Sequence, residues 1–185
     1  MRVILGFAGE IASGKGTAAK HLVDKYGSGY FRFSTILRDV LKRMHLEESR
    51  ENTQKLSTLM RQNFGEDILS KVISKDVLND RHDIIAVDGV RRLSDIKYLK
   101  DVPVFRLVYI EADIEKRFER IVKRGENVDD KSKTLEQFKK DNEGEAEAQI
   151  KGLKAHADFV VDNNGAIAEL YGKIDGIVEE CRKEK

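Results

Sequence analysis

A chain of 185 residues with 40% hydrophobic content is long enough to bury the core of one domain. Its 34 basic and 33 acidic residues leave a formal net charge of +1, which argues against a general nucleic-acid-binding surface. No apolar run approaches the length of a membrane span, and the single cysteine, Cys181, cannot form an internal disulfide. We therefore expect a cytoplasmic protein, monomeric or homodimeric, without a membrane partner.

Short apolar runs alternate along the chain with segments of helical periodicity. The runs that predict strands are 2–8, 30–34, 83–89, 102–112 and, with its turn, 157–165. The segments that predict helices are 15–26, 35–44, 50–79, 93–101, 113–125, about 135–154 and 166–180. Strands that are apolar on both faces and alternate with helices are typical of a parallel sheet. We predict an α/β fold, a doubly wound five-stranded parallel sheet, in one domain spanning residues 1–185.

The connection between the first strand and the first helix has the pattern of a phosphate-binding loop. Residues 9–15, "GEIASGK", match G-x-x-x-x-G-K in the strand–loop–helix context that the motif requires. Backbone N–H groups and the helix N-terminus would hold phosphates, and the Lys15 ammonium would reach their oxygens. The alternative is a glycine-rich turn with a solvated lysine, which this context disfavours. The residues expected to contact the nucleotide are Gly9, Ala12, Ser13, Gly14, Lys15, Gly16 and Thr17.

The residue after Lys15 is Gly16, and the hydroxyl of Thr17 comes one position later than in the general P-loop. The resulting "GKGT" resembles the nucleoside monophosphate kinases of the adenylate kinase type, within the P-loop kinase superfamily. The resemblance implies ATP as a co-substrate and Mg²⁺ as the cofactor, with Thr17 near the metal. It also implies a helical acceptor-binding segment at about 35–80 and a lid at about 117–150.

The stretch "FSTILRDVL" at 33–41 is similar to the acceptor-binding S-T-G-D-M-L-R of this family. Ser34, Thr35 and Arg38 match and would face the acceptor and its phosphate, since an arginine fork pairs well with a phosphate. The alternative is a helix capped by Ser34 with an exposed Arg38. Beside the phosphate loop, the acceptor-binding interpretation is the stronger one.

The stretch "AVDGVRRLSD" at 86–95 resembles the family's D-G-F-P-R. The resemblance implies that Asp88, at a strand end, holds a water of the Mg²⁺ shell. It also implies that Arg92 contacts a phosphate. Because Arg91 replaces the proline, the sequence leaves open which of the two arginines points inward. A strand-end aspartate can also serve merely as a helix cap.

The stretch "RFERIVKRG" at 117–125 resembles the R-I-x-x-R of the family's lid. Arg120 and Arg124 lie on one helix face with Arg117, where three like charges would favour an anion such as a transferring phosphoryl group. The alternative is a solvated face balanced by glutamates. The expected catalytic residues are Lys15, Asp88, Arg92, Arg120 and Arg124, with Arg120 also contacting the nucleotide.

The last strand, "ADFVVDNNG", is similar to the end of the sheet in dephospho-CoA kinases, whose turn borders adenine. The resemblance places Asn164 at the nucleotide, although Asn-Asn-Gly is also simply a good turn. Two departures leave the acceptor open: the phosphate loop lacks the family's proline, and 126–154 is a long acidic helical segment. We predict ATP-dependent phosphoryl transfer to a small phosphorylated acceptor, foremost a nucleoside or deoxynucleoside monophosphate. The alternatives are a dephospho-CoA kinase and a regulatory ATPase that acts through a partner.

Overall fold

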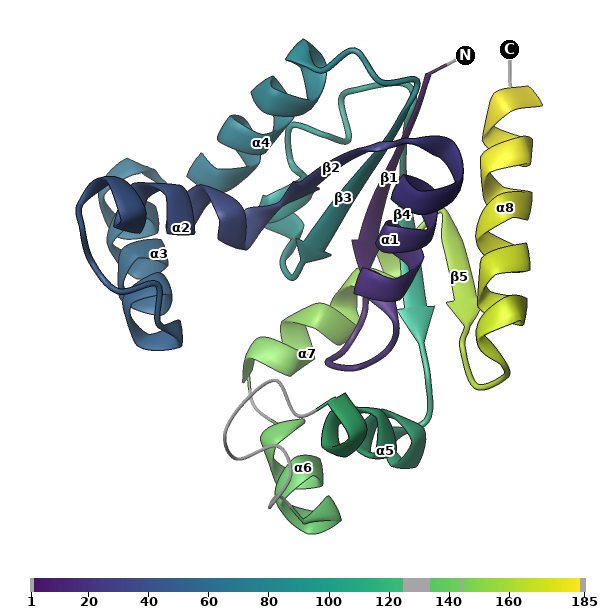
Figure 1. The fold of residues 1–185 in the computed structure, drawn as a ribbon. Coiled ribbons are helices and arrows are strands. Elements are labelled where there is room, and N and C mark those ends of the chain that lie inside the picture. Colours follow the sequence, from purple (N-terminus) through teal and green to yellow (C-terminus); the bar gives the residue numbers. More distant parts are fainter. Residues whose placement is uncertain (1, 125–133, 144, 184–185) are drawn as a thin grey trace.

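A parallel sheet forms the centre of the protein in the computed structural model, which describes residues 2–124, 134–143 and 145–183. Its five strands lie in the order β2-β3-β1-β4-β5, and every neighbouring pair is parallel. The strands are β1 (Val3–Ala8), β2 (Gly29–Arg32), β3 (Ile84–Val90), β4 (Phe105–Glu111) and β5 (Phe159–Asp162). The predicted five-stranded parallel sheet is confirmed. Its carboxyl ends point toward one end of the molecule (Figure 1).

Helices cover both faces of the sheet, as predicted for a doubly wound fold. One face packs against α1 (Lys15–Tyr26) and α8 (Ile167–Lys183). The other packs against α2 (Phe33–Arg43), α4 (Ile68–Asn79), the 3₁₀ turns η1 (Leu93–Ile96) and η2 (Leu153–His156), and the end of α7 (Glu145–Gly152). The remaining helices are α3 (Arg50–Phe64), α5 (Ile114–Arg124) and α6 (Leu135–Asp141). In Figure 1, α5, α6 and α7 gather beyond the carboxyl ends of the strands.

The alternation of side chains along β1 explains why it occupies the centre of the sheet. Val3, Leu5 and Phe7 pack on the α1 side, whereas Ile4 and Ala8 pack on the α2 side. All five are at most 1% exposed. Burying a large apolar side chain of this kind contributes about 1.5–3 kcal/mol, so a strand without a polar face is stable only inside such a sheet.

Three predicted helices differ from the structure. The helix predicted over about 135–154 is divided into α6, α7 and the 3₁₀ turn η2. The helix predicted over 50–79 is two helices, because Gly65 adopts a φ of +100° and ends α3. The helix predicted over 93–101 is only the 3₁₀ turn η1 followed by turns, and Pro103 soon after it disfavours further helix. The first part of the acidic segment 126–154, residues 126–133, lies outside the described residues. Among the described helices, none combines the length and apolarity needed to cross a membrane.

Candidate active site

The phosphate loop joins β1 to α1 at the carboxyl end of the central strand. Gly9 has a φ of +141°, and a Cβ there would lie 2.1 Å from the Ile110 carbonyl oxygen. Gly14 has a φ of +114°, and a Cβ there would lie 2.2 Å from Nδ2 of Asn163. Both positions therefore exclude any side chain, by backbone conformation and by space. The loop passes so close to β4 and to the turn after β5 that only glycine fits.

Lys15 begins α1 and turns its side chain back over the loop. Its Nζ donates to the carbonyl oxygens of Gly9, at 2.5 Å, and Glu10, at 2.8 Å. These bonds hold the ammonium over the phosphate loop, next to the N-terminus of α1. The arrangement gathers positive charge at one point and suits the phosphates of a nucleotide.

Of the other predicted loop residues, Ala12 and Ser13 are constrained by the fold, whereas Gly16 and Thr17 are partly or fully exposed at the start of α1. Ala12 has a φ of +60°, and Ser13 is fully buried with no hydrogen-bond partner for its Oγ among the described residues. Gly16 is exposed, and a Cβ there would meet no atom within 4 Å. Thr17 follows it in the first turn of α1, partly exposed. The fold thus requires glycine at position 14, whereas it would accept a side chain at position 16.

Asn163, in the turn after β5, ties the last strand to the loop. Its Nδ2 donates to the Ser13 carbonyl at 2.7 Å, and the residue is 6% exposed. Its own carbonyl accepts from Nη2 of Arg120 at 2.7 Å, while Nη1 of Arg120 lies 3.5 Å from the Ala12 carbonyl. Arg120 therefore sits beside the loop. The sequence indicates only a turn at Asn163 and gives no sign that its side chain bonds to the phosphate loop.

Asn164, which the sequence places at the nucleotide, is engaged with neighbouring residues. Its Oδ1 accepts from the Asp113 backbone at 2.8 Å, and its Nδ2 donates to the Asp162 carboxylate at 2.7 Å. These bonds join the turn after β5 to the start of α5. The side chain thus shapes the turn beside the loop.

Arg117 does not form a common anion-binding face with the other arginines of α5. It is 3% exposed and donates to Oε1 of Glu10 at 3.0 Å, to Oδ1 of Asn142 at 2.7 Å and to the Ile11 carbonyl at 3.3 Å. A buried arginine with these partners links the phosphate loop to the end of α6. Arg124 ends α5, and its side chain lies outside the described residues.

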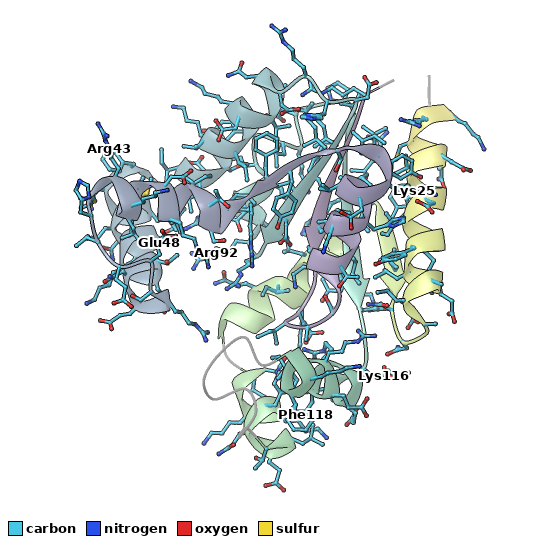
Figure 2. The ribbon with its side chains drawn as sticks, viewed as in Figure 1. Lys25, Arg43, Glu48, Arg92, Lys116 and Phe118 are labelled. Carbon is cyan, nitrogen blue, oxygen red and sulfur yellow. The ribbon has the colours of Figure 1, made fainter. Side chains whose placement is uncertain are left out.

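The predicted acceptor-binding residues lie on α2 and after β3. Thr35 and Arg38 are exposed, and Ser34 has a buried Oγ without a partner among the described residues. Arg91 is exposed, whereas Nη1 of Arg92 lies 3.3 Å from Oε2 of Glu66. Figure 2 shows Arg92 below α2, in the region between the α2–α3 pair and α7.

A buried ion pair that sequence reasoning missed supports this region. Nη2 of Arg61, on α3, lies 2.7 Å from Oδ1 of Asp95, and the two side chains are 8% and 3% exposed. Oδ2 of Asp95 accepts from the backbone N–H groups of Arg91, at 3.0 Å, and Arg92, at 3.1 Å. Arg61 also donates to the Glu66 carbonyl. The only signal in the sequence was the position of Asp95, three residues after Arg92, where a carboxylate can cap a helical turn.

Asp88 lies in the last part of β3, on the face of the sheet that packs against α1. Oδ2 of Asp88 accepts from the Tyr30 hydroxyl at 2.9 Å and lies 3.5 Å from Nε of Arg32. Burial raises the pKa of Tyr30 to about 12, helped by the charge and the hydrogen bond of Asp88. Tyr30 therefore remains a donor at neutral pH. Among the described residues, no group of three or more His, Cys, Asp and Glu side chains could hold a metal ion alone.

The sequence matches one protein-family model over the part of the chain that contains these features. The model of the AAA domain family AAA_17 matches residues 8–139, which is more than half of the chain. The chain belongs to the AAA_17 family. The match runs from the end of β1 to α6, so it includes the phosphate loop, Asp88 and α5.

Curated relatives and solved structures also match over nearly the whole chain. The UPF0200 protein of Hyperthermus butylicus is 27% identical over 169 residues, covering 91% of this chain and 89% of the relative. The crystal structure of TT1252 from Thermus thermophilus has a TM-score of 0.66 at 15% identity, covering 97% of each chain. Shikimate kinase from Bacteroides thetaiotaomicron has a TM-score of 0.64 at 11% identity, covering 96% of this chain and 98% of that chain. The predicted P-loop kinase fold is confirmed.

Proposed function

We propose that the protein transfers a phosphoryl group from ATP, as its Mg²⁺ complex, to the phosphate of a nucleoside or deoxynucleoside monophosphate. One observation carries the proposal. The parallel sheet brings a phosphate loop, a buried strand-end aspartate and a group of arginines to the carboxyl ends of its strands. This is the edge where open α/β sheets bind ligands. The named kinase among the structural neighbours is consistent with this chemistry.

The residues present fit a magnesium-bound nucleotide. Thr17 lies in the first turn of α1, and Asp88 lies on the face of the sheet against which α1 packs. Hydroxyl and carboxylate oxygens are ligands that Mg²⁺ accepts, directly or through its waters. When bound, the metal would neutralise charge on the phosphates. Thr17 and Asp88 would hold it, and Lys15 with the loop amides would orient the phosphates.

The acceptor side of the site favours a nucleophile that is already ionised. Residues 32–38, which are the last residue of β2 and the first half of α2, include Arg32 and Arg38 but no carboxylate before Asp39. A hydroxyl acceptor benefits from a general base within hydrogen-bond reach, whereas a phosphate oxygen is ionised at neutral pH. Asp88 already accepts a hydrogen bond from Tyr30. The cationic junction therefore supports a monophosphate over the hydroxyl of dephospho-CoA.

Positioning and charge neutralisation would do most of the catalytic work. Arg38 and one of the two arginines after β3 would bind the acceptor phosphate, and Asp95 fixes the backbone from which both of those arginines project. Arg120 is held beside the loop by backbone carbonyls, so a short side-chain movement would bring it to the transferring group. No covalent enzyme intermediate is needed.

The deciding experiment is ADP release with Mg·ATP against all ribo- and deoxynucleoside monophosphates and dephospho-CoA. We expect rapid turnover with a monophosphate, its loss in Lys15→Ala, and an acceptor KM raised about tenfold or more in Arg38→Ala. Arg43→Ala, at the C-terminal end of α2, is the matched control and should retain wild-type kinetics. Turnover with dephospho-CoA alone would transfer the assignment to that kinase. Slow ADP release that ignores every acceptor would contradict a kinase and indicate an ATPase that acts through a partner.

A further inference from the structure

The carboxylate of Asp88 is shared with a strand that the sequence motifs do not include. Two side chains of the edge strand β2 reach the same oxygen, Oδ2, through the Tyr30 hydroxyl at 2.9 Å and Nε of Arg32 at 3.5 Å. Arg32 and Asp88 are register partners in the sheet, so their side chains emerge on the same face. The contact is therefore built into the pairing of β2 with β3.

The backbone of β3 is adapted at the point where this contact forms. The register between β1 and β3 shifts directly after Asp88, where Gly89 is skipped in the pairing and has a φ of +85°. A Cβ at Gly89 would lie 3.9 Å from Cγ of Arg32, so the stem of the arginine passes beside the bulge. Bulges of this kind re-aim side chains next to functional sites. Here the bulge adjoins the contact between the Arg32 guanidinium and a carboxylate that our proposed function assigns to the metal shell.

The two partners of this ion pair differ sharply in exposure. The side chain of Asp88 is 6% exposed, whereas that of Arg32 is 47% exposed. Among the described residues, Asp88 is the partner of Arg32. Because the guanidinium is half-exposed and 3.5 Å from the carboxylate, its attraction to Asp88 is partly screened, and the Tyr30 hydroxyl stays bonded to the carboxylate when Arg32 leaves. Arg32 also directly precedes α2, whose first turns carry Thr35 and Arg38.

We propose that Arg32 is a specificity-determining residue whose guanidinium exchanges the Asp88 carboxylate for the phosphate of the acceptor. Arg32 neutralises Asp88 in the free protein, and it turns to the phosphate of the acceptor once Asp88 joins the Mg²⁺ shell. A guanidinium and a divalent cation compete for one carboxylate, and a released arginine fork suits a phosphate. This inference rests on the proposed function for its second half, the contact with the acceptor. Its first half concerns Asp88 and requires no acceptor.

For one variant, the exchange predicts a lower Mg²⁺ requirement for ATP binding and a higher KM for the acceptor. In Arg32→Gln, the Mg²⁺ concentration that half-saturates ATP binding should fall about twofold to fivefold, the size expected for one partly screened ion pair. The acceptor KM should rise about tenfold or more, because a charged phosphate partner is lost. Calorimetric titrations of ATP at a series of fixed Mg²⁺ concentrations measure the first quantity without any acceptor.

Arg43→Gln is the control, since Figure 2 shows Arg43 at the far end of α2 and it should change neither quantity. Arg32→Lys keeps the charge without the fork, so it should restore the Mg²⁺ dependence but only part of the acceptor affinity. An unchanged or increased Mg²⁺ requirement in Arg32→Gln would overturn the exchange. A lowered Mg²⁺ requirement with an unchanged acceptor KM would overturn the acceptor contact alone. If no monophosphate is phosphorylated by the wild type, the proposed function and the acceptor contact both fail, and the Mg²⁺ titration still decides the competition for Asp88.

Discussion

Replacing Gly14 by alanine perturbs the phosphate loop without touching its charges. The residue has a φ of +114°, a conformation that side chains with a Cβ rarely adopt. The added methyl would lie 2.2 Å from Nδ2 of Asn163, which donates a buried hydrogen bond to the Ser13 carbonyl. The asparagine must move away, so the substitution adds backbone strain and also removes a bond between β5 and the loop.

The two effects set the size of the loss. A non-glycine residue in a disfavoured backbone region costs about 1–3 kcal/mol. A buried donor or acceptor left without its partner costs about 1–3 kcal/mol. We therefore expect Gly14→Ala to lower the free energy of unfolding by about 2–6 kcal/mol, which for a chain of this size lowers Tm by roughly 4–24 °C. Urea unfolding and calorimetry of the protein without nucleotide measure both values.

Gly16→Ala is the matched control, two residues further along the chain. The position is exposed, helical and free of any atom within 4 Å of a Cβ, so alanine should leave stability unchanged or raise it by up to about 1 kcal/mol. If Gly16→Ala nevertheless weakens ATP binding, the glycine serves the ligand. Equal stability of the two variants would refute the argument that the fold, through Asn163, requires glycine at position 14.

Three further variants, the first with Glu66→Gln as its control, test polar contacts beside the site and between α1 and α8. Asp95→Asn removes the buried carboxylate that pairs with Arg61, leaving only the exposed Glu66 carboxylate at 3.9 Å, and should cost about 3–5 kcal/mol of unfolding free energy. Glu66→Gln, on the exposed side of the same network, should cost under about 1 kcal/mol. Arg117→Met should lower Tm and weaken ATP binding, because Arg117 joins Glu10 of the loop to α6; unchanged ATP affinity by calorimetry would argue against that link. Asp175→Asn should destabilise the protein by about 1–3 kcal/mol at pH 7, as measured by urea unfolding at several pH values.

The pH dependence of that last variant has a definite sign. Burial raises the pKa of Asp175, but hydrogen bonds from Lys25, His21 and Tyr26 outweigh burial and hold the pKa below its usual range. A lowered pKa in the folded state means that the stabilisation is fully present above about pH 4 and is lost as the pH falls further. The difference between wild type and Asp175→Asn should therefore shrink in acid. A difference that stays constant down to pH 2 would contradict this assignment.

The central part of the fold could be predicted because its determinants are local. The buried run of β1, the glycines of the loop and the periodicity of α1 lie next to one another in the sequence, so each supports the interpretation of the others. Where the local signal was ambiguous, the prediction was wrong. The apolar periodicity continues through 50–79, and only the positive φ of Gly65 in the structure separates α3 from α4.

The sequence by itself determined the phosphate loop, the parallel sheet and the strand-end position of Asp88, because neighbouring residues specify each of them. The tertiary structure decided which side chains meet. Arg61 pairs with Asp95 across 34 positions, Arg117 reaches Glu10 across 107, and Arg32 meets Asp88 only through the register of two strands. An arginine carries no local sign of its partner, since its long side chain reaches whatever anion the fold brings near. The phosphate loop can thus be predicted from consecutive residues, whereas the partners of the arginines depend on the tertiary packing.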